Sequence, residues 1–160
     1  MIQMSIPENR TIEKRRLRMW IRMLRATRSV ESRLRDYLRE EFDTTLPRFD
    51  VMAALYRAED GLKMSALSKR LLVSNGNVTG IVDRLVADGL IRRLPVENDR
   101  RAVVVSLTPP GRTLFARMAR GHEVLINGLF CDIVDKDLNE LADVFGRLKQ
   151  LEGDDGADDR

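Results

Sequence analysis

The sequence contains few of the residues that build disulfide frameworks or metal sites. Its 160 residues include one cysteine, one histidine and one tryptophan, and aromatic residues make up only 5%. A single cysteine excludes an internal disulfide framework and fits a reducing cytoplasm, where we expect the protein to act. One histidine cannot supply a clustered metal site without an unusual set of acids. We therefore expect neither a metal nor a cofactor.

Longer patterns are missing as well. No apolar run approaches the roughly 18 residues of a membrane span, and residues 1–10 lack the apolar core of a signal peptide. The chain has no phosphate-binding glycine loop and no recognisable pairing of a nucleophile with a base. These absences predict a protein that is not an enzyme and does not cross a membrane.

Charge is what the chain has in abundance. Charged residues account for 33%, and the formal net charge is +3. Between Arg10 and Arg39, eleven Lys or Arg residues stand against three acids. Such a run indicates either a polyanionic partner or a solvated helix face. The tail at 152–160 is acidic and contains glycine, so we expect it to be disordered.

Helical spacing of apolar residues dominates both ends of the chain. Residues 12–42 form one long pattern whose apolar stripe begins at Leu17. A helix of this length is too exposed to stand alone in a small domain, so its stripe is expected to pack on another subunit. Start signals predict further helices at Leu46-Pro47, at Thr108-Pro109 and near Asp135.

Two short helical patterns with a tight turn between them occupy the middle of the chain. Ser65 is expected to cap the first, Ser74 the second, and Gly89 to end the second as a C-terminal cap. Asn75-Gly76 is by itself a hairpin signal. The apolar residues behind it nevertheless have helical spacing, and two such helices form a helix-turn-helix. The inward positions would be Val78, Ile81, Val82 and Leu85.

After Gly89 the apolar period becomes alternating. Residues 90–96 and 102–108 are expected to form two strands, and the polar residues 97–101 the loop between them. A helix-turn-helix followed at once by a two-stranded hairpin is a winged helix.

The run from Leu67 to Gly111 resembles the MarR family of bacterial transcriptional regulators. The segments VDRLVADGLIRR, DRR at 99–101 and VSLTPPG carry the resemblance. It implies a mainly α-helical fold, a winged helix-turn-helix with long N- and C-terminal dimerisation helices. The implied domains are an N-terminal arm and dimerisation helix (1–46), the DNA-binding winged helix-turn-helix (47–108), the C-terminal dimerisation helices (109–151) and the acidic tail (152–160).

The resemblance also implies a function. Members of the family are homodimers that bind pseudo-palindromic double-stranded DNA operators, usually as repressors, and release them when a small effector binds. A helical dimerisation or protein-interaction module without DNA binding is the alternative. That alternative would leave the wing tip and the uncharged polar helix face unexplained. The operator sequence and the regulated genes do not follow from the chain.

The second helix of the motif would turn its polar face to the major groove, where Asn can bond adenine bidentately and Thr can meet a thymine methyl. Gly76 and Gly80 would let it sit deep in the groove. Asp99 and Arg101 match the family's wing pattern, in which the Arg enters the minor groove or follows the backbone. Asp83 is expected to pair with a nearby Arg, such as one from the wing, or else to point past the groove wall. The expected DNA-binding residues are Ser65, Ser74, Asn75, Gly76, Asn77, Thr79, Gly80, Arg84, Asp99, Arg100 and Arg101.

An organic effector is the expected signal. Cys131 is expected to be a buried structural thiol rather than a redox sensor. The chain also looks like repressors of hydroxycinnamate catabolism, some of which respond to an aroyl-CoA thioester. Such an effector needs cations for its phosphates, and arginines of the first helix offer them. Relatives commonly bind anionic aromatic molecules between the first, second and fifth helices. Candidate walls by position, each with plain core packing as its alternative, are Trp20, Tyr37, Arg48, Met52, Met118 and His122.

Overall fold

A computed structural model describes residues 8–71, 75–96 and 99–148, with the backbone alone at 8–10, 75, 96 and 99–102. They form two compact units that part inside the fifth helix, between Glu123 and Val124, and each unit is described by itself. In chain order the elements are α1 (Glu8–Phe42), α2 (Leu46–Tyr56), β1 (Leu62–Lys63), α3 (Met64–Leu71), α4 (Asn75–Ala87), β2 (Ile91–Val96), β3 (Asp99–Leu107), α5 (Pro109–Leu129) and α6 (Asp135–Leu148).

The helices begin where the sequence signals them. Pro47 occupies the first turn of α2, where the missing N–H costs no hydrogen bond. Thr108 caps α5: its Oγ1 accepts a hydrogen bond from the Gly111 N–H at 3.1 Å. The last helix begins at Asp135, as expected, and α1 begins at Glu8, four residues before the predicted start. The predicted mainly α-helical fold is confirmed.

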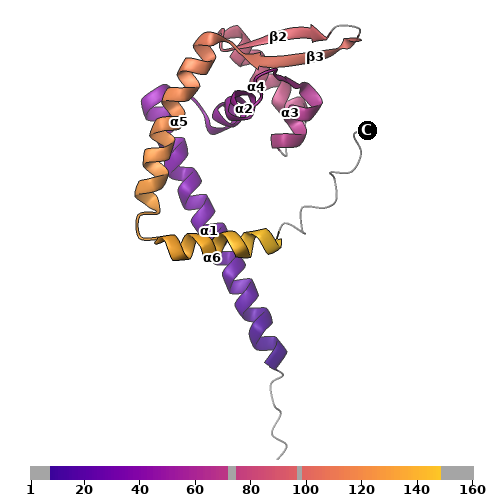
Figure 1. The fold of residues 1–160 in the computed structure, drawn as a ribbon. Helices are drawn as coiled ribbons and strands as arrows, with labels where there is room; N and C mark the ends of the chain where they lie inside the picture. Colours follow the sequence, from indigo (N-terminus) through magenta and orange to yellow (C-terminus); the bar gives the residue numbers. More distant parts are fainter. Residues whose placement is uncertain (1–7, 72–74, 97–98, 149–160) are drawn as a thin grey trace, which may run out of the picture. The chain divides into compact units, whose positions relative to one another are not determined.

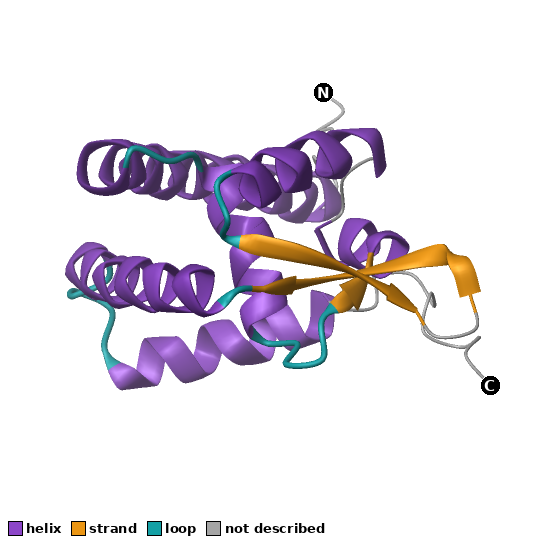
Figure 2. Ribbon diagram, turned by 90° about the horizontal axis from the view of Figure 1, so that it is seen from above, coloured by secondary structure: helices purple, strands orange, loops and turns teal. Residues whose placement is uncertain are grey.

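The first unit holds a three-stranded antiparallel sheet in the order β1-β3-β2. The hairpin pairs Ile91 with Leu107 and Leu94 with Val104, and Figure 2 shows it extending beyond the helices. The third strand, β1, is only two residues long and pairs Leu62 with Val105. It was not expected, because two residues carry no alternation of their own and become a strand only by pairing with β3.

The core of this unit lies where α2, α3 and α4 pack on one another and on the sheet (Figure 1). Side chains that are wholly or almost wholly buried come from each of these elements and from α1 and α5. They include Leu38, Met52, Leu55, Leu67, Val78, Val82, Leu85, Ile91, Val105 and Met118. The predicted inward positions of α4 are confirmed, with Ile81 half-buried and the other three fully buried.

Two expectations about the winged helix are wrong. Ser65 does not cap α3, because the chain passes from β1 straight into the helix at Met64 and Ser65 is its second residue, exposed. The wing loop is shorter than residues 97–101, because the backbone of β3 begins at Asp99, which pairs with Val96. Pairing with β2 therefore continues into the polar segment that looked like a loop.

The second unit contains the end of α5 and the helix α6. None of the α6 side chains is buried, and Leu138, Leu141, Phe145 and Leu148 are between 41% and 51% exposed. An amphipathic helix with its apolar face exposed in this way lacks the packing that normally stabilises it. The second unit by itself therefore leaves the apolar face of α6 without a partner among its described residues.

Cys131 also lies in the second unit, and the expectation of a buried thiol is wrong. Helix α5 ends at Leu129, so Cys131 falls in the turn that follows and its side chain is exposed. It borders a hollow of about 500 Å³ together with Phe130 and Ile133.

No helix among the described residues is long and apolar enough to cross a membrane. The same residues contain no group of three or more His, Cys, Asp or Glu side chains that could hold a metal ion. The acidic tail expected at 152–160 lies outside the described residues.

Gly111 is the residue on which the approach of α5 to Leu90, between α4 and β2, depends. A Cβ at this position would lie 2.0 Å from the carbonyl oxygen of Leu90, which is backbone and cannot rotate away. We expect Gly111→Ala to lower the free energy of unfolding by about 3 kcal/mol, as overpacking does, measured by urea denaturation. Gly80→Ala is the control, because Gly80 is also helical and its Cβ position is open. If Gly111→Ala lowered the free energy of unfolding by less than a typical surface substitution does, the contact of Gly111 with Leu90 would be shown to relax.

Candidate nucleic-acid interface

Helix α4 has a buried face and an exposed polar face. Val78, Val82 and Leu85 are fully buried and anchor the helix to the unit. The opposite face is open to solvent, and a Cβ placed on Gly76 or Gly80 would meet nothing within 4 Å. The exposed residues of α4 include Gly76, Asn77, Thr79, Gly80, Asp83 and Arg84.

The C-terminal end of α4 is fixed by a glycine. Gly89 has a φ of +71°, which a residue with a Cβ adopts only with strain. The Gly89 N–H bonds the Val86 carbonyl at 2.9 Å, and the Leu90 N–H bonds the Leu85 carbonyl at 2.9 Å. This pair of bonds is a Schellman motif. It confirms the predicted cap and turns the chain directly into β2.

The wing is joined to the polar face of α4 by an ion pair. Arg93 of β2 donates to Asp83 Oδ1 at 2.5 Å, which confirms that the acid on this face pairs with an Arg of the wing. Both side chains are well exposed, so the pair contributes little to stability. Its effect is geometric, because it holds one wing arginine beside α4.

The neighbouring arginine points elsewhere. Arg92 Nε donates to Ser106 Oγ at 3.1 Å, which ties β2 to β3 at the base of the wing. Neither Arg92 nor Arg93 was expected in the interface. The sequence does contain a signal for these two residues. Adjacent residues of a strand project to opposite faces, so one of the two consecutive arginines must face α4.

The structure places the other expected DNA-binding residues as follows. Asn77, Thr79 and Arg84 are exposed on α4, and Ser65 is exposed on α3. The backbone of Asn75 begins α4, and the backbones of Asp99, Arg100 and Arg101 begin β3, but the side chains of these four residues are not described. Ser74 lies outside the described residues.

The expected effector residues do not form one group. Tyr37 of α1 donates a hydrogen bond from its hydroxyl to the Met118 carbonyl of α5 at 3.3 Å. Burial, and to a smaller extent the Glu41 carboxylate, raises the pKa of Tyr37. Met52 and Met118 are buried core residues. Trp20 is 56% exposed and lies about 25 Å from Tyr37 along the helix axis.

The other two expected effector residues lie on or beside α2. Arg48 pairs with Asp88 at 2.5 Å. The His122 ring packs 5.3 Å from the Phe49 ring, centroid to centroid. Burial lowers the pKa of His122, which favours the neutral imidazole at pH 7.

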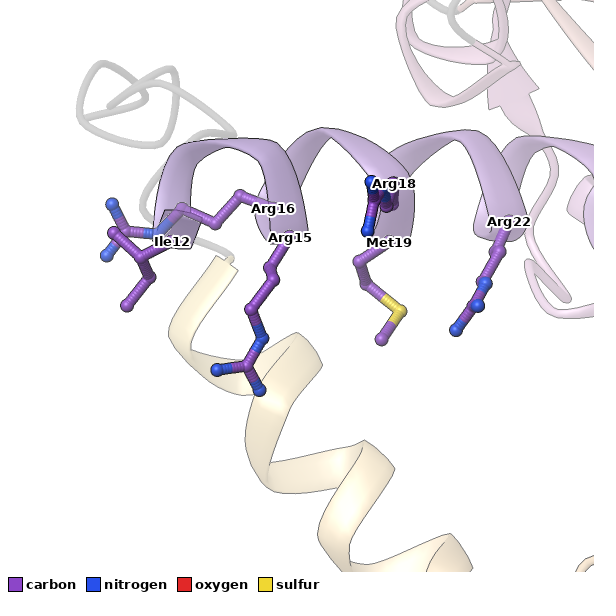
Figure 3. Close-up of a pocket in the computed structure, with 6 residues that line it drawn as sticks. All are labelled: Ile12, Arg15, Arg16, Arg18, Met19 and Arg22. Atoms are coloured by element: carbon purple, nitrogen blue, oxygen red, sulfur yellow. The ribbon is translucent and has the colours of Figure 1, made fainter. Parts of the chain in front are cut away.

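A basic hollow runs along the N-terminal half of α1. Its volume is about 470 Å³, and Figure 3 shows Arg15, Met19 and Arg22 pointing to the same side of the helix. In the part of the chain that the structure describes, the arginines between residues 15 and 28 form no ion pair, whereas Arg35 and Arg39 pair with acids of α1. Its lining residues are Ile12, Arg15, Arg16, Arg18, Met19 and Arg22.

Known proteins are similar to this chain in sequence and in fold. The MarR family model matches residues 42–102. A MarR family transcriptional regulator from Silicibacter pomeroyi is 33% identical in its crystal structure, with a TM-score of 0.72, over 87% of this chain and 96% of that one. The HTH-type transcriptional regulator PecS of Dickeya dadantii is 28% identical over 117 residues, which are 72% of this chain and 70% of PecS.

A third relative was solved on DNA. The structure of the S. aureus MepR–DNA complex has a TM-score of 0.71 over 82% of this chain and 95% of that chain, at 20% identity, which shows the shared fold. The protein from S. pomeroyi and PecS are both named as transcriptional regulators. The winged helix-turn-helix with its polar α4 face, the family match and the relative from S. pomeroyi agree: the chain belongs to the MarR family of DNA-binding transcriptional regulators.

Proposed function

We propose that the protein is a homodimeric repressor that binds a pseudo-palindromic operator and leaves it when a small anionic aromatic effector binds. The observation that carries the DNA-binding part is the exposed polar face of α4, which is held beside the wing by the Asp83–Arg93 pair. Because operator DNA is its ligand, we also propose the cytoplasm as the compartment in which the protein acts.

Exposed apolar residues support the homodimer. On α1, Leu17 and Trp20 are 58% and 56% exposed, and on α6 the apolar stripe is exposed along its length. Exposed apolar faces of this extent in a small chain mark a surface that another chain covers. A second copy would bury like faces against one another, and its two-fold symmetry would match the symmetry of the operator.

The proposed contacts with DNA divide by groove. The first turns of α4, with Asn75, Asn77 and Thr79, would contact base edges in the major groove. The wing would place Arg101 in the minor groove or along the backbone, while Arg100 contacts phosphate and Asp99 holds the turn. Ser65, Ser74 and Arg84 would complete the contacts with the backbone.

The effector would bind between α1, α2 and α5, with Tyr37, Arg48, Met52, Met118 and His122 as the candidate walls. Trp20 is too far along α1 to join them within one chain, so in the dimer it would have to come from the second copy. An aroyl-CoA thioester would explain the arginines of the α1 hollow that form no ion pair among the described residues: Arg15, Arg16, Arg18 and Arg22. Like Trp20, they would then have to come from the second copy.

Selection of bound sequences from a random DNA pool tests the proposed function directly. The expected result is an inverted repeat whose affinity falls steeply as salt is raised, because phosphate contacts release counterions. A reporter gene placed behind the recovered site then shows whether binding represses or activates. Recovery of no sequence, with no salt-dependent binding to random DNA, would contradict DNA binding by this chain.

Arg101→Ala should abolish tight binding to the recovered operator while leaving the dimer intact. The reason is that the minor-groove or backbone contact of the wing is lost, whereas the proposed dimer helices are untouched. Mobility shift measures the binding, and size-exclusion chromatography measures the dimer. Arg147→Ala on α6 is the control for the loss of one cation. An unchanged mobility shift would contradict a role of Arg101 in operator binding.

Gly80→Ala should separate stability from binding. Alanine replaces glycine in the interior of α4 with open space around it, so the free energy of unfolding should rise by up to about 1 kcal/mol. Operator affinity should fall, because the new methyl group lies between the helix and the groove floor. If affinity rose together with stability, Gly80 would be merely tolerated and would have no part in docking.

Calorimetry can decide between a free acid and its thioester. If the α1 hollow binds CoA phosphates, a hydroxycinnamoyl-CoA should bind at least tenfold more tightly than the free acid, as expected for a few charge-assisted bonds. Arg15→Gln with Arg22→Gln should remove that difference and leave binding of the free acid unchanged. Equal affinity of the two forms for the unaltered protein would exclude the phosphate site.

A further inference from the structure

Four arginines of α1 recur at the spacing that places side chains along one line of a helix. We call them the arginine stripe, and they are Arg15, Arg18, Arg22 and Arg25. At 3.6 residues per turn they fall within an arc of about 80° and cover about 15 Å of the helix axis. All four side chains are exposed. Figure 3 shows two of them, Arg15 and Arg22, on the same side of α1.

The N-terminal half of α1 supplies no acid that could neutralise the arginine stripe. Residues 14–30 contain seven Lys or Arg and no Asp or Glu. In the described part of the chain the four arginines form no ion pair, whereas Arg35 and Arg39 pair with acids of the same helix. Like charges three or four residues apart on a helix repel one another. A bound polyanion would therefore relieve a repulsion that the helix itself does not relieve.

The arginine stripe and the apolar stripe of α1 lie on different sides of the helix. Leu17, Trp20 and Leu24 are centred about 150° from the four arginines around the helix axis. Leu17 and Trp20 are more than half exposed, and they belong to the surface that a second copy is proposed to cover. A partner helix on that surface leaves the arginines open to solvent.

The arginine stripe is also separated from the operator interface along α1. Leu34 is the first buried residue of α1 among those whose side chains are described, and there the helix joins the core that also anchors α4. The centre of the arginine stripe lies about 20 Å before Leu34 along the helix axis. A duplex that contacts the stripe therefore does not need to touch α4 or the wing.

We propose that the arginine stripe is a second, sequence-independent surface for double-stranded DNA. DNA carries one negative charge per about 1.7 Å of its axis, so a row of guanidinium groups about 15 Å long has several phosphates within reach. Each guanidinium can bind phosphate oxygens with two parallel hydrogen bonds. Such contacts carry no sequence information. A dimer held on its operator meets neighbouring DNA at high local concentration, and the stripe would bind that DNA.

Phosphate is also the group through which a CoA thioester is proposed to bind α1. The α1 hollow includes three residues of the stripe, Arg15, Arg18 and Arg22. DNA and the thioester would therefore compete for these side chains. The DNA surface goes beyond the proposed function and does not depend on the effector, because it needs only the exposed arginines.

Fluorescence anisotropy with a labelled duplex of random sequence tests this surface in the full-length protein. The protein is first given one unlabelled operator duplex per dimer, limited to the inverted repeat, so that α4 and the wing are occupied. Random DNA should still bind. Arg18→Gln combined with Arg22→Gln should lower that affinity roughly tenfold at low salt. The salt slope should fall by about two, because each lost phosphate contact removes about 0.9. Operator affinity should stay unchanged.

The matched control is Arg35→Gln combined with Arg39→Gln. These two arginines have the same spacing on the same helix, and each already pairs with an acid of α1. The control variant has the same net charge as the test variant. Its affinity for random DNA and its salt slope should equal those of the unaltered protein.

Four results would overturn the proposal. An equal loss in both variants would show a general effect of net charge. Random DNA that the operator displaces completely would place all DNA binding at α4 and the wing. Dissociation of the dimer in the Arg18 and Arg22 variant, measured by size-exclusion chromatography, would assign the stripe to the contact between copies. A dependence on these arginines that appears only after residues 152–160 are removed would assign it to the acidic tail.

Failure of the proposed function is seen separately. It would appear as the absence of an operator complex in the unaltered protein. The comparison of the two variants on random DNA can still be made in that case, without the operator.

Discussion

The winged helix depends on one crowded junction, where the chain leaves α4. Gly89 turns left-handed so that β2 can start at once. The next carbonyl, that of Leu90, accepts the Thr108 N–H and lies against Gly111, where no side chain would fit. One carbonyl thus contacts the start of α5 through both Thr108 and Gly111. This backbone contact joins the end of α4, the start of β2 and the start of α5, and side chains such as Val82 and Leu85 pack the other side of α4.

The polar groups around this junction have unequal importance. The Asp83–Arg93 pair is exposed and aligns the wing with α4 at little energetic cost. In the Arg48–Asp88 pair, the Arg48 side chain is the less exposed of the two. Each of the two charges lies at the end of its own helix where the helix dipole disfavours it, and the pair offsets this. Arginine is abundant in this chain, and Arg48 differs in that its Nε is buried and has no hydrogen-bond acceptor among the described residues.

Much of this architecture could be predicted from local signals, because they act within one turn of the chain. Three such signals predict local structure without any information on distant residues. They are the cap at Thr108, the glycine at 89 and the spacing of Val78, Val82 and Leu85. The strand β1 could not be predicted, since Leu62 and Lys63 are a strand only because β3 lies beside them. The exposed Cys131 was missed because α5 ends one turn earlier than its apolar residues indicated. The contact of Arg48 with Asp88 follows from tertiary packing alone, and no spacing in the sequence indicates it.

The open space around Gly76 and Gly80 has a further consequence for how such a protein can change. The buried residues that anchor α4 lie on its other face, so the glycines of the surface offered to a groove contribute no packing to the fold. A duplicated copy of the gene can therefore acquire a different polar face through a few codon changes without first being rescued from instability. The exposed residues of α4 can therefore change while the fold is kept, so related proteins can diverge in the DNA sequence that they bind.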